Sequence, residues 1–218
     1  MSSMPFFIPL FLSCFPTDVY AEKPEIHFKR INPNMGLSSA LVRSIYQDHR
    51  GFMWFATEDG LNRFDGKNFK VYKNSYDDTT SISNSYISVV YEDHEQNLWV
   101  GTMGGGINRY LRETDNFKHY TAEQNNSSNL SDNFIYAILQ DKSGNLWVGT
   151  DFGLNKLEPD SEHFINIYAN QDNQLHLSNN RVRAIFKDSA GRLWVGTDGG
   201  GLNRLDPGSN QFIHYFTY

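Results

Sequence analysis

The chain has 218 residues, enough for one or two domains at about 150 residues each. Its 19 Lys and Arg residues against 25 Asp and Glu residues give a formal net charge of −6 at pH 7, which argues against nucleic-acid binding because a phosphate backbone is bound by a basic stripe. A mean hydropathy of −0.54 excludes a multi-span membrane protein, and the single cysteine, Cys14, excludes an intrachain disulfide and a cysteine-based zinc cluster. Aromatic residues at 15%, together with 17 glycines, are typical of short strands joined by tight turns.

Residues 1–21 form a segment unlike the rest of the chain, without Lys or Arg. The apolar run Pro5–Phe15 is too short to span a bilayer of about 30 Å as a helix, but its length matches a signal-peptide core, and Val19–Ala21 offers small residues for cleavage. We therefore interpret residues 1–21 as a signal peptide. A buried or mis-started leader is the alternative, because a positively charged start is missing, and Phe11–Cys14 fits a lipidation box poorly. No other apolar stretch approaches the length of a membrane helix, so we expect no anchor in this chain.

A tandem repeat covers the rest of the sequence. The four tryptophans, Trp54, Trp99, Trp147 and Trp194, stand at spacings of 45, 48 and 47 residues. Other residue types keep the same frame: Asp48, Asp93, Asp141 and Asp188; Thr57, Thr102, Thr150 and Thr197; Asn62, Asn108, Asn155 and Asn203; and a closing Phe and Tyr in each unit. Agreement at this many positions identifies an array of four units.

One unit contains four short strands. In the last unit we expect strands at residues 182–188, 193–197, 202–205 and 212–216, separated by turns that contain Gly, Asp, Asn or Pro. Four antiparallel strands in about 47 residues make one blade of a β-propeller. No segment shows a sustained helical stripe, so the sequence predicts an all-β fold with almost no helix.

We assign the four four-stranded antiparallel blades to residues 37–73, 74–121, 122–169 and 170–218. Residues 22–36 are expected to form a leading outer strand, because Ile26–Ile31 has the pattern of the strand that ends each unit. In a closed propeller such a strand completes the last blade, but here the last blade already has its own outer strand. We therefore expect an open arc of a larger ring, with seven blades favoured.

The repeated Trp and Asp residues are interpreted as structural. A blade must bury both faces against its neighbours, and a large aromatic side chain supplies the buried area. The Asp that precedes each Trp is expected to cap the Asp-x-x-Gly or related turn by accepting backbone N–H groups. A ligand-stacking role for Trp and a metal or catalytic role for Asp are the alternatives.

Ligands are expected on the face formed by the loops between the second and third strands and the loops between units. These loops contain positions that vary among units within a fixed framework, and variable residues at a channel mouth can recognise a ligand. The candidate ligand-binding residues are Asn84, Tyr86, Asn133, Phe134, Asn180, Arg181, Asp59, Met103, Phe152 and Asp198. Aromatic rings beside amides suit sugar recognition, although ordinary variable surface is the alternative.

We find no catalytic constellation, no metal-binding spacing and no cofactor motif. The histidines are scattered, and the glycine triplets at 104–106 and 199–201 are not followed by the Lys-Ser/Thr of a phosphate-binding loop. The Asp-x-x-Gly-x-x-Trp pattern is similar to the Asp-box of sialidase propellers but is one residue longer between Asp and Gly.

The segments Asp141–Thr150 and Asp188–Thr197, each followed by a Gly-Leu-Asn stretch, resemble the two-component regulator propeller repeat. The opening, with Gly51–Trp54 and Asp59–Gly66, resembles the N-terminal periplasmic sensor portion of Bacteroidetes hybrid two-component histidine kinases. The resemblance implies an exported, non-enzymatic sensor of oligosaccharides whose further blades, membrane helix and kinase are absent from this chain, and it allows a homodimer of the full-length protein. A propeller enzyme acting on a glycan or lactone, and a protein-interaction scaffold, are the alternatives.

Overall fold

The computed structural model describes Phe28 and residues 30–123, 129–169, 176–206, 208–209 and 211–216. The chain divides into two units, Met1–Arg30 and Ile31–Tyr218, and the strands of the described residues lie in the second. The expected signal peptide, with Cys14 and the alternative lipidation box, lies outside the described residues. Among the residues that are described, no helix is long and apolar enough to cross a membrane.

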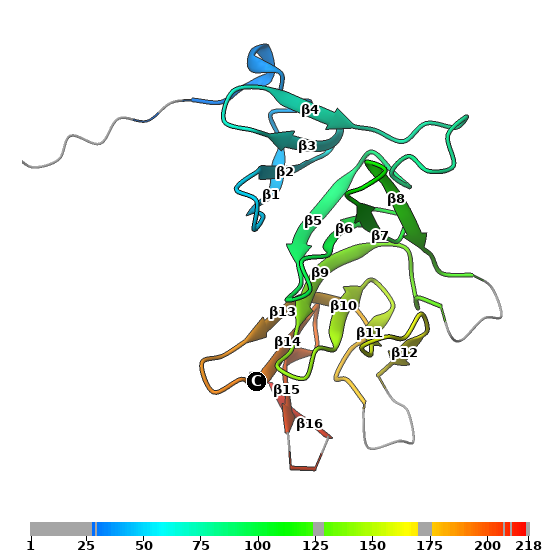
Figure 1. Ribbon diagram of the computed structural model, residues 1–218. Helices are drawn as coiled ribbons and strands as arrows, with labels where there is room; N and C mark the ends of the chain where they lie inside the picture. The colour runs from blue at the N-terminus through cyan, green and yellow to red at the C-terminus, as the bar shows by residue number, and fades with distance from the viewer. Residues whose placement is uncertain are drawn as a thin grey trace, which may run out of the picture. The chain divides into compact units, whose positions relative to one another are not determined.

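Four separate sheets follow one another along the chain, each made of four consecutive antiparallel strands in sequence order (Figure 1). Blades 1 and 2 contain β1 (Val42–Gln47), β2 (Met53–Thr57), β3 (Gly60–Phe64), β4 (Phe69–Tyr72), β5 (Ile87–Glu92), β6 (Leu98–Thr102), β7 (Ile107–Leu111) and β8 (Asn116–Tyr120). Blades 3 and 4 contain β9 (Ile135–Gln140), β10 (Leu146–Thr150), β11 (Gly153–Leu157), β12 (Phe164–Ile167), β13 (Val182–Lys187), β14 (Leu193–Thr197), β15 (Gly201–Asp206) and β16 (Gln211–Tyr215). The all-β prediction is confirmed, and every strand falls inside the blade range expected for it.

The leading segment 22–36 is described only in part. Residues 22–27 and Lys29 lie outside the described residues, and the described remainder contains no strand. It forms instead the short 3-10 helix η1 (Pro33–Met35), which Asn32 caps by accepting a hydrogen bond from the Asn34 N–H at 3.0 Å and which Gly36 ends with a φ of 104°. Proline after asparagine favours such a turn over an extended strand. The spare outer strand predicted from residues 26–31 stays a prediction, because most of these residues lie outside the described part of the chain.

The hydrophobic core consists of three clusters, one at each junction between successive blades. The tryptophan of each earlier blade packs at the junction with the next one: Trp54 with Ile87 and Val90, Trp99 with Ile135 and Ile138, and Trp147 with Val182. The inner strands β1, β5, β9 and β13 contact one another in chain order. Each blade is thus stabilised by its neighbours rather than by a core of its own.

Every tryptophan is tied to the aspartate six residues before it. The indole Nε1–H donates to the Asp Oδ2 at 2.9 Å in blade 1, 2.7 Å in blade 2, 2.8 Å in blade 3 and 2.9 Å in blade 4. The other carboxylate oxygen, Oδ1, accepts backbone N–H groups of the following turn in all four blades. One carboxylate therefore closes the turn between the first two strands and satisfies the buried indole N–H.

A second repeated network fixes the opposite end of each blade. In blade 1, the Asn62 Oδ1 accepts the Ser38 N–H at 2.8 Å, the Ser38 and Thr57 hydroxyls lie 2.8 Å apart, and the Thr57 hydroxyl donates to the Gly60 carbonyl at 2.8 Å. The same Asn-to-Ser contact recurs in blades 2, 3 and 4 at 3.0, 2.7 and 2.9 Å. The four asparagines are fully buried. We call this network the Thr–Ser–Asn lock. It anchors the loop between blades to the second and third strands.

Candidate functional site

The two loop sets expected to form the ligand face are joined by backbone hydrogen bonds within each of blades 2 to 4. The Met103 N–H donates to the Tyr86 carbonyl at 2.9 Å, the Asp151 N–H to the Phe134 carbonyl at 3.2 Å, and the Asp198 N–H to the Arg181 carbonyl at 2.8 Å. Met103 also forms an isolated antiparallel bridge with Phe134 of the next blade. The structure therefore joins the two loops of each of these blades, and the Met103–Phe134 bridge joins the loops of blades 2 and 3.

The three candidate asparagines hold the loops themselves. The Asn84 Oδ1 accepts the Tyr86 N–H at 2.8 Å, and its Nδ2 donates to the Met103 carbonyl at 3.2 Å. The Oδ1 atoms of Asn133 and Asn180 accept the N–H groups of Ala122 and Ala169 at 2.7 and 2.6 Å. The Asn84 bonds lie within blade 2, and those of Asn133 and Asn180 hold the segment that follows an outer strand against the loop before the next inner strand, so each amide already has a partner within the protein. A ligand contact from them stays a prediction.

Tyr86 belongs to a charged cluster at the junction of blades 1 and 2. Its hydroxyl donates to the Glu58 Oε1 at 2.9 Å and accepts from the Arg43 Nη2 at 2.7 Å, while Arg43 and Glu58 also form an ion pair. The hydrogen bond from Arg43 is the main cause that holds the pKa of Glu58 below its usual range. Nearby, the Asp59 carboxylate pairs with the Lys73 ammonium at 2.7 Å.

A larger cluster links blades 3 and 4. The Arg183 Nη2 lies 3.0 Å from the Asp151 Oδ1 and 3.2 Å from the Asp198 Oδ2, and the guanidinium carbon sits 4.0 Å from the centre of the Tyr136 ring. The Arg181 Nη1, whose side chain is largely exposed, is 4.0 Å from the same Asp198 oxygen. Charges and an aromatic ring are therefore fixed together by contacts within the protein.

Exposed aromatic rings flank this cluster. Phe134 and Phe152 have 45% and 55% of their surface exposed, and the Phe152 ring lies 5.6 Å from that of Tyr168. Large exposed apolar side chains beside fixed polar groups are typical of a ligand surface. We define the blade 3–4 patch by six residues: Phe134, Asp151, Phe152, Arg181, Arg183 and Asp198.

Sequence reasoning missed Arg43 and Arg183, which organise both clusters. They occupy the second position of the inner strand, where the four units carry Arg43, Ser88, Tyr136 and Arg183. This position varies as strongly as the one analysed two residues earlier, so the same comparison among units would have found it. Its partners come from other loops and from the neighbouring blade, which the sequence does not show.

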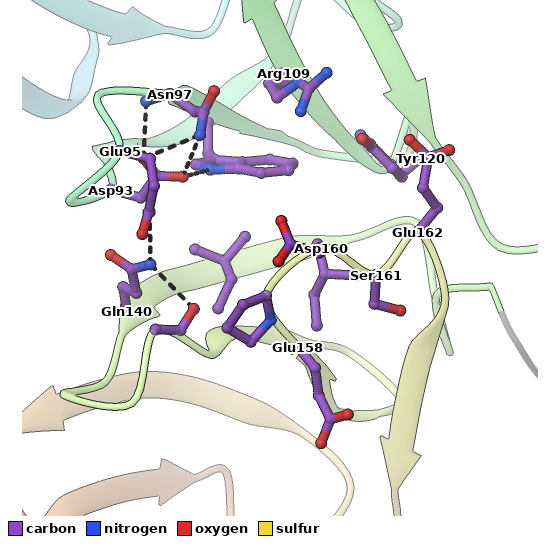
Figure 2. A pocket seen from close by; sticks show the side chains of 15 residues that line it. Asp93, Glu95, Asn97, Arg109, Tyr120, Gln140, Glu158, Asp160, Ser161 and Glu162 are labelled. Atoms are coloured by element: carbon purple, nitrogen blue, oxygen red, sulfur yellow. Dashed lines mark hydrogen bonds between the residues drawn. The ribbon is translucent and has the colours of Figure 1, made fainter.

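A separate pocket of about 240 Å³ lies between blades 2 and 3, at the end of the blades opposite the Thr–Ser–Asn lock. Figure 2 shows Asp93, Glu95 and Gln140 on one side of it, with the Gln140 Nε2 donating to the Glu95 Oε2 at 2.9 Å, and Arg109 on another. Its lining residues come from the first turn and the strands β6, β7 and β8 of blade 2, and from β9, β10, β11 and the first and last turns of blade 3. The pocket was not predicted because its residues are distant in sequence. Among the described residues, no group of three or more His, Cys, Asp or Glu side chains could hold a metal ion.

The comparison with known protein families gives four matches, at residues 36–59, 81–104, 129–152 and 176–199, to the family described as two component regulator propeller. The chain contains four two-component regulator propeller repeats. Each match covers the start of one blade up to its second hairpin, and so includes the Asp, Trp and Thr of the repeat.

This propeller protein is similar to extracellular parts of bacterial sensors. It is 31% identical to the extracellular domain of a hybrid two-component system from B. thetaiotaomicron, with a TM-score of 0.77, over 86% of this chain and 26% of that one. It is 40% identical over 83 residues to histidine kinase P4 of Formosa agariphila, a match of 38% of this chain and 6% of the kinase. The chain thus spans a small part of the length of these relatives.

A virginiamycin B lyase from Staphylococcus aureus has the same fold. It is 17% identical, with a TM-score of 0.57 over 80% of this chain and 55% of that one. At this identity the likeness extends to the propeller architecture alone. The relatives of this chain at 30% identity or more are thus parts of two-component systems, whereas the propeller enzyme is similar to it in fold alone.

Proposed function

We propose that this chain is the ligand-sensing propeller portion of a two-component signal-transduction sensor, that its ligand is an oligosaccharide, and that it acts in the periplasm after the leader 1–21 is removed. The similarity to extracellular domains of two-component systems supports the sensor role. Further blades, a membrane-spanning part and the kinase would belong to the remainder of a longer protein. Binding of the ligand would be transmitted through these parts.

The blade 3–4 patch is the observation that supports an oligosaccharide as the ligand. The rings of Phe134 and Phe152 offer exposed apolar faces on which the C–H face of a sugar can stack. The Arg183 guanidinium offers N–H donors to sugar hydroxyl groups, and the Asp151 and Asp198 carboxylates that hold it offer acceptors. Because these groups are already fixed in the free protein, little ordering entropy opposes binding.

The test is calorimetric titration of the purified chain with a panel of oligosaccharides. Phe152→Ala should weaken the Kd of the ligand about 5- to 10-fold, since an aromatic stacking contact contributes about 1 to 1.5 kcal/mol. Ile165→Ala is the matched control, because Ile165 is 45% exposed but lies on the outer strand β12. Absence of heat with every oligosaccharide contradicts the ligand class, and an equal loss in both variants contradicts the patch.

A propeller enzyme acting on a glycan or lactone is the second candidate, and Asp132 is the observation that favours it. Burial raises the pKa of the Asp132 carboxyl, and the nearby charge of Asp151 acts in the same direction. A carboxyl that keeps its proton to higher pH suits general acid catalysis. Turnover of a polysaccharide and lactone panel, abolished by Asp132→Asn, would favour the enzyme. Binding without turnover would favour the sensor.

A further inference from the structure

The side chain of Tyr110 fills part of the junction between blades 1 and 2. Its hydroxyl accepts a hydrogen bond from the Arg63 Nη1 at 3.0 Å, lies 3.2 Å from the Tyr72 hydroxyl and donates to the Asp115 Oδ1. Its ring lies 5.2 Å from that of Trp54 and 5.7 Å from that of Tyr72. Tyr110 is 4% exposed, so its phenol group occupies a buried space bounded by two aromatic rings, a cation and a carboxylate.

The junction between blades 2 and 3 repeats the surroundings of this phenol group. The cation, the two rings and the carboxylate have counterparts there: Arg109, Trp99, Tyr120 and Glu162. Arg109 is paired with Trp99 across β6 and β7, in the register that blade 1 has. The Trp99 and Tyr120 rings lie 5.6 Å apart, compared with 5.9 Å for their counterparts. Glu162 forms an ion pair with Lys118 of blade 2, as its counterpart does with a lysine of blade 1.

The phenol group itself is missing from this second junction, because Leu157 stands where Tyr110 stands in the first. Both residues pair with the phenylalanine in the fourth strand of their own blade, so their positions are equivalent. Two further large side chains are replaced by smaller ones: Arg112 by Pro159, and Phe52 by Asn97. The pocket of about 240 Å³ lies where these three exchanges occur, and Leu157, Pro159 and Asn97 all line it.

The pocket keeps the polar groups that Tyr110 satisfies in the first junction. Within the part of the chain that the structure describes, the Arg109 guanidinium has no hydrogen bond or ion pair, whereas its counterpart donates to the Tyr110 hydroxyl. The hydrogen bond from Lys118 is the main cause that lowers the pKa of Glu162, so this carboxyl is ionised at neutral pH and accepts hydrogen bonds. Figure 2 shows Arg109, Tyr120, Asp160 and Glu162 around the pocket.

We propose that the pocket between blades 2 and 3 binds the phenol group of a small aromatic molecule, at the place that corresponds to Tyr110 between blades 1 and 2. The ring packs against Trp99 and Leu157, and the hydroxyl accepts a hydrogen bond from Arg109 and donates one to Glu162. A cavity of about 150 Å³ is enough for a benzene-sized ring, so this pocket has room for a phenol that carries a substituent. The pocket shares no residue with the blade 3–4 patch, and the inference does not rest on an oligosaccharide ligand.

The probe is p-cresol, which is the tyrosine side chain as a free molecule. Ligand-observed NMR titration of the purified chain should show saturable binding with a Kd on the order of 1 mM, as is typical of a ligand of this size. Toluene, which lacks the hydroxyl, should bind about 5-fold more weakly or worse, because it leaves Arg109 without an acceptor. Equal binding of toluene and p-cresol would overturn the recognition of a phenol. So would the absence of saturable p-cresol binding at ten times this concentration.

Two variants locate the site. Leu157→Tyr supplies a phenol group from the chain itself and should weaken p-cresol binding by more than about 10-fold, whereas the matched control Leu205→Tyr, at the same position of blade 4, should leave the Kd unchanged. Arg109→Met should weaken binding about 5- to 10-fold, because it removes the charged donor but keeps most of the side chain. It also keeps the test decisive if circular dichroism shows that Leu157→Tyr does not fold. An unchanged Kd in Arg109→Met, or an equal loss in Leu157→Tyr and Leu205→Tyr, would overturn the proposal.

Discussion

Arg112 offers the sharpest test of how two neighbouring blades are held together. It is 14% exposed, and its guanidinium pairs with the Asp48 Oδ2 of blade 1 at 3.0 Å and the Glu92 Oε1 of blade 2 at 2.5 Å. Both carboxylates are buried, at 0% and 6% exposure. Arg112→Met keeps most of the buried side-chain volume but leaves Asp48 without a cation and Glu92 with the His49 ring, at 2.7 Å from its Oε1, in place of the guanidinium. Removing one partner of a buried ion pair costs about 3 kcal/mol or more, and we expect that loss in the free energy of unfolding.

The next junction provides the matched rescue. There, Pro159 stands at the position of Arg112 and the neutral Gln140 at that of Glu92, so that the junction lacks both the cation and one of the anions. The double variant Arg112→Met/Glu92→Gln should therefore regain about 1 to 2 kcal/mol relative to Arg112→Met alone. Urea unfolding at one protein concentration measures each value. A loss below about 1 kcal/mol for the single variant, or a double variant that is no more stable, would refute the reasoning.

The same site gives a pH dependence. Burial raises the pKa of Asp48, but hydrogen bonds from Trp54, Arg112 and the backbone N–H of Phe52 outweigh it and hold the pKa below its usual range. A lowered pKa stabilises the fold at pH values above that of the unfolded carboxyl, about 3.9, and this contribution is lost as the pH falls through the folded value. Stability of the parent should consequently fall more steeply between pH 5 and pH 3 than that of Arg112→Met.

Three further predictions concern other blades. Trp147→Phe should cost about 2 kcal/mol in thermal unfolding because it removes buried area and the bond to Asp141, whereas Trp194→Phe, at the half-exposed equivalent, should cost clearly less; equal losses would contradict the junction cores. Gly149→Ala should destabilise by about 2 kcal/mol through its clash with Val182, and Gly196→Ala, where the nearest atom lies 3.7 Å away, should change stability by under about 0.5 kcal/mol; a similar loss in both would contradict the role of the Val182 contact. Hydrogen bonds from Lys70, Tyr110 and Tyr72 outweigh burial and lower the pKa of Asp115 to about 2, so Asp115→Asn should flatten the stability curve between pH 4 and pH 2, and an unchanged curve would show that this carboxylate does not contribute.

The blades could be predicted from the sequence because the four strands of a blade are consecutive in the chain and the same pattern of residues occurs in four units. The Trp, Asp and Thr residues mark the same three turns in every unit, so strand order and strand limits follow from one blade. The leading strand stays a prediction, since most of Ile26–Ile31 lies outside the described residues, and the turn that Asn32 and Pro33 impose was not predicted. Comparison among units thus predicts the strands inside the array well, but it gives no information on the turn that precedes the first unit.

The candidate site could be predicted from the sequence only in part, because many of its contacts join different loops or blades. Exposed Phe134 and Phe152 lie where the loops were expected, because variability at a loop position does not depend on the partner. The role of Asn133 could not be predicted, since its side-chain oxygen accepts the backbone N–H of Ala122, eleven residues earlier in the chain. Arg183 was missed because its carboxylate partners belong to hairpins of two different blades. Contacts between blades depend on the three-dimensional register, which no single unit records.

The Thr–Ser–Asn lock allows the length of the hairpin between the second and third strands to vary while the strands keep their positions. The threonine hydroxyl reaches the carbonyl of a hairpin glycine in all four blades, at 2.8 Å to Gly60, 2.8 Å to Gly106, 2.9 Å to Gly153 and 3.1 Å to Gly201, although the hairpins of blades 2 and 4 contain one residue more. The extra residue lies between the threonine and the glycine that this hydrogen bond joins, so the difference in length does not shift the strands. A scaffold of this kind can acquire new recognition surfaces by exchanging hairpins, both during evolution and in a designed loop library. The strands and the repeated hydrogen bonds that hold each blade are kept.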